Sequence, residues 1–359
     1  MASETANDTI STALSDVDGA AGKLIIAGRD VERWAETASF EDACALLWGT
    51  ADGRPRSSAH IRKRLGAARL EAWNRLGGLG DALSAPDGMD ALRAAVGHLR
   101  LGDAAEEADL RVTAVVAVYA AAWARIRAGK APVAPDPSLD QAEDYLRMIT
   151  GDAPAAAAAR AMSTYLVTVS DHGMNASTFT ARVVASTNSD IVSSVVAAIG
   201  ALKGPLHGGA PGPVLDMLDA IGEPSRAEAF IASELEAGRR IMGMGHRIYR
   251  VRDPRAQVLE KATLALIDAG LRTERLALAR AVERVAKSAL AARYPDRKLE
   301  ANVEFYTAVL LDAIGLPREA FTPTFAVGRV VGWCAHIAEQ RDKGRLIRPP
   351  SRYVGTLAN

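Results

Sequence analysis

The sequence is poor in aromatic residues, cysteine and net charge, and each shortage disfavours a class of protein. Phe, Trp and Tyr make up 5% of the chain while alanine and leucine abound, a balance that favours helix over sheet. Two cysteines, Cys44 and Cys334, do not require a disulfide, so we expect reduced thiols in a cytoplasmic protein. Lys and Arg number 43 and so do Asp and Glu, a neutrality that argues against a nucleic-acid partner.

A long apolar run is also missing. The longest strongly apolar stretch without charge, Val112–Ala124, is too short for a bilayer, which needs about 20 residues, so we expect a buried helix and no membrane span. The polar, acidic stretch Met1–Thr12 does not have the pattern of a signal peptide. With 49% hydrophobic residues over 359 positions, the chain can build a large core in about two domains.

Helical periodicity runs through most of the chain. Ser39 is a good N-cap for an amphipathic helix that reaches Gly49. The only strand candidate is Gly22–Ile26, which follows Val17-Asp-Gly19 and predicts a small hairpin. Further helices are predicted at Leu110–Arg127, Ile191–Leu202, Leu215–Ile221, Arg226–Arg240, Ala256–Ala269, Leu276–Ala292, Val303–Ile314 and Thr324–Glu339.

The first segment that indicates chemistry is the turn Lys203–Ala210, with the sequence KGPLHGGA. His207 lies among glycines just before a helix, where a ligand can approach the backbone closely and free N–H groups are available. Such a histidine is able to present a ring nitrogen to a ligand carbonyl. The alternative is an ordinary loop histidine that caps the helix.

The second segment, Ile241–Arg255, combines glycines, His246 and a cluster of arginines. Arginines at this density in a neutral protein indicate recognition of a phosphate or carboxylate. The alternative is a solvated charged turn in which Asp253 pairs with a neighbour. The four arginines are Arg247, Arg250, Arg252 and Arg255.

Two further groups complete the pattern. Asn302 predicts an N-cap that puts Glu304 in the first turn of a helix, where the helix dipole favours an ionised carboxylate. Such a carboxylate suits a general base, although a first-turn acid is common. Arg329 lies in an apolar helix, which is costly unless the arginine meets an anion from the protein or from a substrate.

Together these groups suit enol chemistry on an acyl thioester. A carboxylate removes the methyl proton while a neutral histidine donates to the enolate oxygen. A second histidine polarises a keto group, and arginines hold the carboxylates beside it.

The order of these segments resembles the citrate synthase family. The chain carries GPLHGGA, GHRIYRVRDPRA, NVEFY, TFAVGRVVGWCAHIAEQ and RPPSRY in that family's order and spacing. The start of the chain, with LSDVDG and FEDACALLWG, fits as well, so the resemblance covers nearly the whole sequence.

The resemblance implies a role for each matching residue. His207 would donate to the acetyl-CoA carbonyl, His246 would polarise the carbonyl of oxaloacetate, and Glu304 stands where the family usually has an aspartate base. Arg255 and Arg329 would hold substrate carboxylates, and Arg348 would reach the partner's site in a homodimer. The CoA side would be formed by Arg250 and by Met242, Gly243, Met244 and Gly245.

The resemblance also implies an all-α fold with a large domain, 1–209 and 315–359, and an inserted small, mobile domain, 210–314, whose closure excludes water. CoA and its acetyl thioester would be co-substrates, with no permanently bound cofactor. The six histidines form no ligand cluster, so we expect no metal. His60 and His98 are expected at the surface, and His336 with Glu339 is weak evidence for a metal.

The sequence departs from the family pattern at two positions. Glu304 is one methylene longer than the usual aspartate, and Val169 replaces a histidine that contacts substrate in most members. Valine cannot bind a carboxylate, so another donor moves in, the keto-acid differs, or its affinity is weak. His172 is interpreted as structural.

Three other functions remain open. Propionyl-CoA in place of acetyl-CoA would give 2-methylcitrate, because one methylene in an apolar pocket discriminates only about 10- to 200-fold. Cleavage of citryl-CoA would use the same residues in reverse. A weakly active relative that binds CoA or a keto-acid would also account for the changes at Val169 and Glu304.

Overall fold

Two buried helices form the centre of the molecule. The computed structural model describes residues 10–101, 107–208, 211–246, 248–271 and 274–356. Helix α5 (Ala108–Arg127) is buried on all sides from Val112 to Ala124, and α15 (Phe321–Lys343) is buried from Pro323 to Ile337, as expected for helices enclosed by others. They pack against each other, and α2 (Phe40–Asp52) packs on α15.

Shorter helices surround this pair. Helix α3 (Ser58–Asn74) and α4 (Gly88–Gly97) pack on α5, and α8 (Ala176–Ala185) packs on α9 (Ile191–Leu202). A buried ion pair joins α3 to α6 (Gln141–Thr150), because Arg69 Nε donates to Asp144 Oδ2 at 2.7 Å. The remaining elements of this body are α1 (Val31–Trp34), α7 (Ala156–Thr168) and the 3-10 helices η1 (Leu76–Gly78), η2 (Ala82–Ser84) and η4 (Arg318–Ala320).

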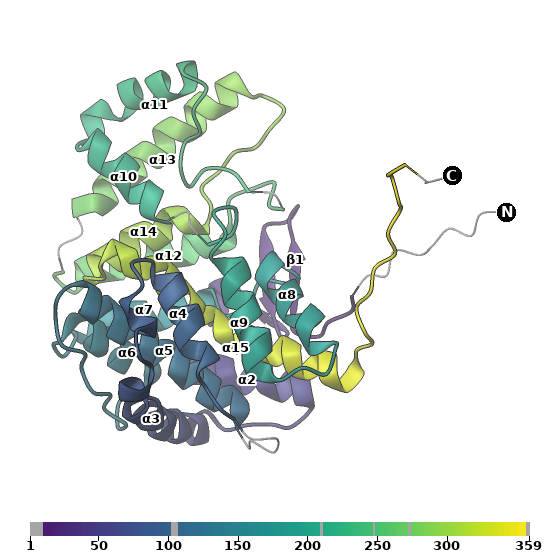
Figure 1. Ribbon diagram of the computed structural model, residues 1–359. Coiled ribbons are helices and arrows are strands. Elements are labelled where there is room, and N and C mark those ends of the chain that lie inside the picture. Colours follow the sequence, from purple (N-terminus) through teal and green to yellow (C-terminus); the bar gives the residue numbers. More distant parts are fainter. Residues whose placement is uncertain (1–9, 102–106, 209–210, 247, 272–273, 357–359) are drawn as a thin grey trace.

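A separate group of helices lies above this body (Figure 1). It contains α10 (Pro211–Ile221), η3 (Pro224–Arg226), α11 (Ala227–Glu236) and α13 (Glu274–Arg293). Helices α12 (Pro254–Asp268) and α14 (Val303–Ala313) connect it to the body, since α12 packs on both α14 and α7 while α14 packs on α10.

A small antiparallel sheet lies at the edge of the body, near the level where the two groups of helices meet (Figure 1). It consists of β1 (Ser15–Asp18), β2 (Lys23–Ile26) and β3 (Arg29–Asp30) in that order. The register pairs Ser15 with Ile26 and Asp18 with Lys23, and Leu24 and Ile26 bury their side chains in the core. The predicted hairpin and the all-α fold class are therefore confirmed.

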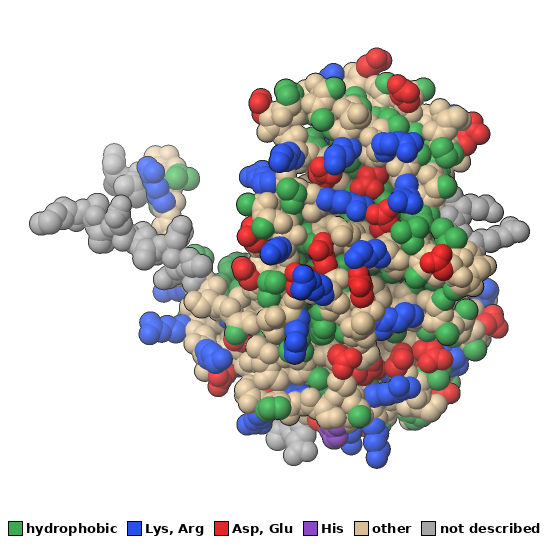
Figure 2. Space-filling view, turned by 180° about the vertical axis from the view of Figure 1, so that it is seen from behind, with side chains coloured by type: hydrophobic (Ala, Val, Ile, Leu, Met, Phe, Trp, Pro, Cys, Tyr) green, Lys and Arg blue, Asp and Glu red, His purple; other side chains and the backbone are tan. Residues whose placement is uncertain are grey.

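The surface and the thiols agree with the composition. Basic and acidic side chains are interspersed on the face shown in Figure 2, in keeping with zero net charge. Both cysteines are free and buried. None of the helices in the described ranges is long and apolar enough to cross a membrane. His60 and His98 are exposed, as expected.

Candidate active site

The candidate base stands at the start of α14. Asn302 caps this helix by accepting a hydrogen bond from the Glu304 backbone N–H at 3.0 Å, which confirms the predicted N-cap. Burial raises the pKa of Glu304 to about 7, and Asp253 adds to the rise while the positive charges of Arg255 and Arg329 oppose it. A carboxyl group with a pKa near neutrality suits proton abstraction at physiological pH.

Arg255 is fixed by a carboxylate two residues before it. Its Nε lies 3.0 Å from Asp253 Oδ1 and its Nη2 lies 2.7 Å from Asp253 Oδ2. Asp253 also caps α12 and accepts a hydrogen bond from the Val303 backbone N–H at 3.2 Å. One carboxylate therefore joins the start of α12, which carries Arg255, to the start of α14, which carries Glu304. Asp253 does pair with a neighbour, as the alternative supposed, but its pair with Arg255 is buried and does not form a solvated turn.

Arg329 is a buried cation in the middle of α15. Its Nε donates to the Val169 carbonyl oxygen at 2.6 Å, and its guanidinium lies 4.9 Å from the centre of the Phe325 ring. Its Nη2 is buried and has no hydrogen-bond partner among the described residues. Burial lowers the pKa of Arg329 to about 10, and the negative charge of Asp171 opposes this shift. A buried guanidinium with an unsatisfied donor is a suitable site for a carboxylate.

Val169, which replaces the usual histidine, contacts Arg329 through its backbone carbonyl group. Its carbonyl oxygen accepts the bond from Arg329 Nε, and its side chain is 1% exposed. A Cβ atom on Gly328 would lie 2.5 Å from Val169 Cγ2, so the valine side chain fills the space that the glycine leaves on α15.

His246 is held as a neutral ring with a defined tautomer. Its Nδ1 accepts hydrogen bonds from the backbone N–H groups of Ile248, at 3.0 Å, and Tyr249, at 3.2 Å. Burial and the charge of Arg255 lower its pKa to about 4, so the ring is uncharged at neutral pH. Since Nδ1 is an acceptor, the proton of the neutral ring is on Nε2, which lies 3.5 Å from Arg255 Nη2. Both of these nitrogens are donors, so a ligand oxygen is able to accept from both.

His207 is oriented by Ser177 at the start of α8. Its Nε2 lies 2.8 Å from Ser177 Oγ and accepts from the Ser177 backbone N–H at 3.4 Å. The Ser177 hydroxyl oxygen accepts from Trp333 Nε1 at 3.1 Å. Burial, with Arg329 and Arg255, lowers the pKa of His207 to about 4. The accepting Nε2 assigns the proton of the neutral ring to Nδ1, which is then free to donate to a ligand.

His172, interpreted from the sequence as structural, contacts the same cluster. Its Nε2 lies 3.0 Å from the Tyr249 hydroxyl, and its ring meets that of His246 edge-on with 5.8 Å between centroids. Burial lowers its pKa, and Arg255, Arg329 and His246 add to the effect. The sequence pointed to His172 but not to its partners, because these contacts form where the loop 169–175 meets His246 and Tyr249.

The segment predicted for the CoA side is paired with the start of α14. Met244 forms a β-bridge with Ala301, and Asn302 Nδ2 donates to the Gly245 carbonyl oxygen at 2.9 Å. Gly243 has φ +74, and a Cβ atom there would lie 2.8 Å from the Phe305 ring, so glycine is required. Met242 is 38% exposed.

Two predicted arginines do not join the cluster. The side chains of Arg250 and Arg348 are exposed, and Arg348 lies in the segment after α15 that extends away from the body (Figure 1). Arg247 lies outside the described residues. Among the described residues, no group of three or more His, Cys, Asp or Glu side chains is arranged to hold a metal ion.

His336 and Glu339 belong to a buried network instead. Arg182 Nη1 lies 2.9 Å from His336 Nδ1 and 2.6 Å from Glu339 Oε2, and His336 Nε2 lies 3.2 Å from Asp171 Oδ2. This network joins α8 and α15 to the loop that carries His172.

Comparison with known proteins finds relatives over nearly the whole chain. Residues 5–350 match the family model described as citrate synthase, C-terminal domain. The chain is 36% identical to the citrate synthase of Deinococcus radiodurans over 95% of its own length and 92% of the relative's. It is 38% identical to citrate synthase 2 of Bacillus subtilis, over 92% and 90%. The solved ternary complex of Thermoplasma acidophilum citrate synthase with carboxymethyl coenzyme A and oxaloacetate is 27% identical, covers 98% of this chain and 96% of its own, and superposes with a TM-score of 0.84.

Proposed function

This chain belongs to the citrate synthase family, and from that premise we propose that it condenses acetyl-CoA with oxaloacetate through Glu304, His207 and His246. Glu304 removes a proton from the acetyl methyl group while His207 Nδ1–H donates to the thioester oxygen. His246 Nε2–H polarises the keto group of oxaloacetate. The enol carbon attacks that carbonyl carbon, and the resulting alkoxide takes up a proton in place of the one that Glu304 removed. Water then cleaves the thioester to release citrate and CoA.

The pKa pattern is the observation that carries this proposal. Burial raises the pKa of Glu304 to about 7 and lowers the pKa of each histidine to about 4; the charge of Arg255 acts on all three groups, and that of Arg329 acts on Glu304 and His207. The base is therefore available near neutral pH while both histidines remain uncharged donors. A neutral donor stabilises a developing enolate without protonating it fully.

Arg255 and Arg329 are proposed to bind the carboxylates of oxaloacetate. Both side chains are buried, and Arg329 Nη2 has no hydrogen-bond partner in the part of the chain that the structure describes. His172, between His246 and Tyr249, is a further candidate ligand for the same substrate. Met242–Gly245 and Arg250 are proposed to face CoA.

Release of CoA thiol tests this function. Acetyl-CoA and propionyl-CoA are each incubated with and without oxaloacetate, using wild type and Glu304→Ala. We expect thiol release that requires oxaloacetate and falls by about 10³-fold or more in the variant. The ratio of the two rates separates citrate from 2-methylcitrate synthesis. Binding of CoA with no thiol release from either thioester would contradict the synthase function and favour a binding protein.

A homodimer is proposed to complete the site. Arg348 lies in the exposed segment 344–356, which also leaves Leu346, Tyr353 and Val354 more than half exposed, at 60%, 69% and 88%. Several exposed apolar side chains on one short segment indicate a surface that another chain covers. We propose that Arg348 binds substrate in the site of a second copy.

Subunit complementation tests the role of Arg348. Arg348→Ala and His207→Ala are each expected to be inactive alone. In a mixed dimer, the subunit with intact His207 receives an intact Arg348 from the other subunit, so one site is complete. We therefore expect activity to return after the two variants are unfolded and refolded together. No recovery would show that Arg348 acts within its own chain or not at all.

Residues 210–314 are proposed to form the mobile small domain. The helices α10, α11 and α13 form a group above the body in Figure 1, which supports a unit that closes over the site. Since α12 packs on α7 in the body, we propose that the rotation is taken up near the start of α12. A smaller radius of gyration in solution scattering on addition of oxaloacetate and CoA would support closure, and an unchanged radius would contradict it.

A further inference from the structure

The tip of the β1–β2 hairpin is packed against the segment that holds His246. The Arg250 backbone N–H donates to the Gly19 carbonyl oxygen at 2.7 Å. A Cβ atom on Gly19 would overlap the Ile248 carbonyl oxygen, and one on Gly22 would overlap the Val251 side chain. The hairpin and the segment 248–251 therefore touch backbone to backbone, which glycine alone allows.

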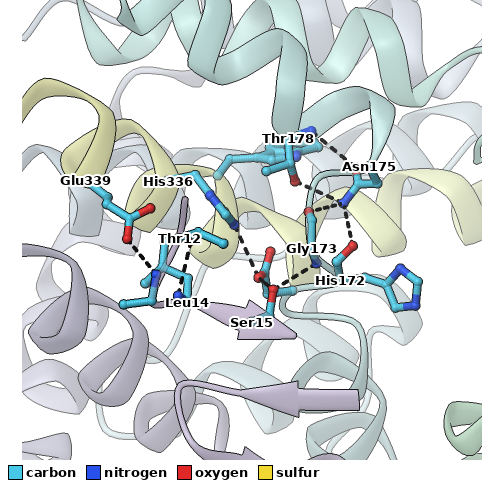
Figure 3. Close-up of polar contacts among 12 residues, drawn as sticks. Thr12, Leu14, Ser15, His172, Gly173, Asn175, Thr178, His336 and Glu339 are labelled. Carbon is cyan, nitrogen blue, oxygen red and sulfur yellow. Dashed lines mark hydrogen bonds and ion pairs between the residues drawn. The ribbon is translucent and has the colours of Figure 1, made fainter. Parts of the chain in front are cut away.

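The same hairpin holds the loop that carries His172. Ser15 Oγ donates to Asp171 Oδ2 at 2.5 Å and accepts from the Gly173 backbone N–H at 2.8 Å (Figure 3). A Cβ atom on Gly173, which has φ +57, would lie 3.2 Å from Val17 Cγ2. The Ser15 hydroxyl therefore holds Asp171 and Gly173, the residues on either side of His172.

The hairpin is itself anchored on the helix that carries Arg329. The Ala13 backbone N–H donates to Glu339 Oε1 at 2.8 Å, and Asp171 Oδ2 meets His336 Nε2 at 3.2 Å (Figure 3). Glu339 and His336 both contact Arg182, and all three side chains are buried. The base of the hairpin is therefore rigid relative to α15, and its tip is the part that reaches the segment 248–251.

We propose that this hairpin is a positioning element for the keto-acid end of the site, with Gly19 and Ser15 as positioning residues. The proposal rests on the proposed role of His246. The direction of His246 Nε2–H depends on the backbone N–H groups of Ile248 and Tyr249 that hold Nδ1, and these depend on the contact with Gly19. The Tyr249 hydroxyl in turn contacts His172. The hairpin therefore fixes the position of His246 through Gly19 and that of His172 through Ser15.

Gly19→Ala tests the contact at the tip. The added methyl group displaces Ile248 and rotates His246, and a displacement on the order of 1 Å costs about 10²-fold in rate. We expect kcat/KM for oxaloacetate to fall by about 10- to 100-fold and the calorimetric Kd for oxaloacetate to rise by about tenfold, while KM for acetyl-CoA stays within about twofold. The melting temperature is measured on the same samples.

Gly28→Ala is the matched control in the same sheet. Gly28 lies at the turn between β2 and β3 with φ +80, and a Cβ atom there would meet nothing within 4 Å. The substitution therefore strains the sheet without touching the segment 248–251. We expect a lower melting temperature with kinetic constants and oxaloacetate affinity like those of wild type.

Ser15→Ala and Ser15→Thr test the contact of Ser15 with Asp171 and Gly173. They also keep the proposal testable if Gly19→Ala does not fold. We expect Ser15→Ala to raise the Kd and KM for oxaloacetate by several-fold, and Ser15→Thr, which keeps the hydroxyl, to recover most of the loss. Oxaloacetate affinity unchanged in both Gly19→Ala and Ser15→Ala, or lost equally in Gly28→Ala, would overturn the proposal. Wild type that binds oxaloacetate but releases no CoA would instead contradict the proposed function, and calorimetry on the same variants would still decide the role of the hairpin.

Discussion

Asp253 accepts hydrogen bonds from Arg255 through both carboxylate oxygens, at 3.0 Å from Nε and 2.7 Å from Nη2. The pair is buried, so each charge depends on the other for its stability in the core. The same carboxylate raises the pKa of Glu304 and caps α12. Asp253 is therefore important for substrate binding, for the base and for the fold.

Asp253→Asn is therefore predicted to impair both stability and binding. Asparagine keeps the cap on α12 but removes the charge that Arg255 needs. We expect a loss of about 3–5 kcal/mol of unfolding free energy and a rise of about tenfold in KM for oxaloacetate. Urea unfolding and steady-state kinetics measure the two effects. Wild-type values for both would show that Arg255 is held by other groups.

The rate of the condensation is predicted to depend on pH through Glu304. The base works when ionised, and burial raises its pKa to about 7, so kcat/KM for acetyl-CoA should fall about tenfold per pH unit below that value. His207 and His246, with pKa values lowered to about 4, stay neutral above about pH 5.5 and add no second limb.

Glu304→Asp and Glu304→Gln are the controls for this profile. Aspartate retains an ionising group and should keep a pH limb at a rate lower by about 10²-fold, because the carboxylate is one methylene farther from the substrate. Glutamine cannot ionise, so Glu304→Gln should lose both the activity and its decline at low pH. A flat wild-type profile from about pH 5.5 to 8 would exclude Glu304 as the base.

Local signals in the sequence predicted the strongly patterned helices well. The helix Ile191–Leu202 has the predicted bounds, and α2 begins after Ser39 with a capping box to Asp42. Helix α3 was not predicted, because charged and small residues surround a thin stripe of Ile61, Leu65 and Ala68, and packing on α5 supplies its stability. Helices α4, α6, α7 and α8 were also missed.

The site was less predictable than the fold, because its geometry arises where segments far apart in the sequence meet. Motifs identified His207, His246 and Glu304 one by one. The roles of His172 and Ser15 depend on contacts across 77 and 158 residues of chain, to Tyr249 and Gly173 respectively, and no local pattern encodes those. The bond from Arg329 to the Val169 carbonyl is also invisible in sequence, since any residue at 169 supplies that oxygen.

Arg329→Met is predicted to separate stability from binding. The guanidinium is buried with Nη2 unsatisfied among the described residues, so its burial costs folding stability, as expected if its proposed role is to bind a substrate carboxylate. Methionine fills much of the same volume without charge. We expect a melting temperature equal to or above that of wild type, and a Kd for oxaloacetate raised by about 100-fold or more.

Calorimetric titration with oxaloacetate and thermal unfolding measure these two effects. Arg69→Met is the matched comparison, because Arg69 is an equally buried arginine but is bound by Asp144, Gln141 and the Leu139 carbonyl in the protein itself. It should lose stability and keep oxaloacetate affinity. A large loss of stability in Arg329→Met would mean that this arginine stabilises the folded chain.

Val169→His, which restores the residue usual in the family, is predicted to harm the protein. The valine side chain packs against Gly328 with almost no exposure, and its carbonyl oxygen holds Arg329. A larger ring in this space costs about 1–3 kcal/mol and displaces that carbonyl. We therefore expect KM for oxaloacetate to rise. Val169→Ala, which loses stability by leaving a cavity instead of overfilling one, is the control and should keep KM close to wild type. A lower KM in Val169→His at unchanged stability would mean that the keto-acid site of wild type is missing a donor.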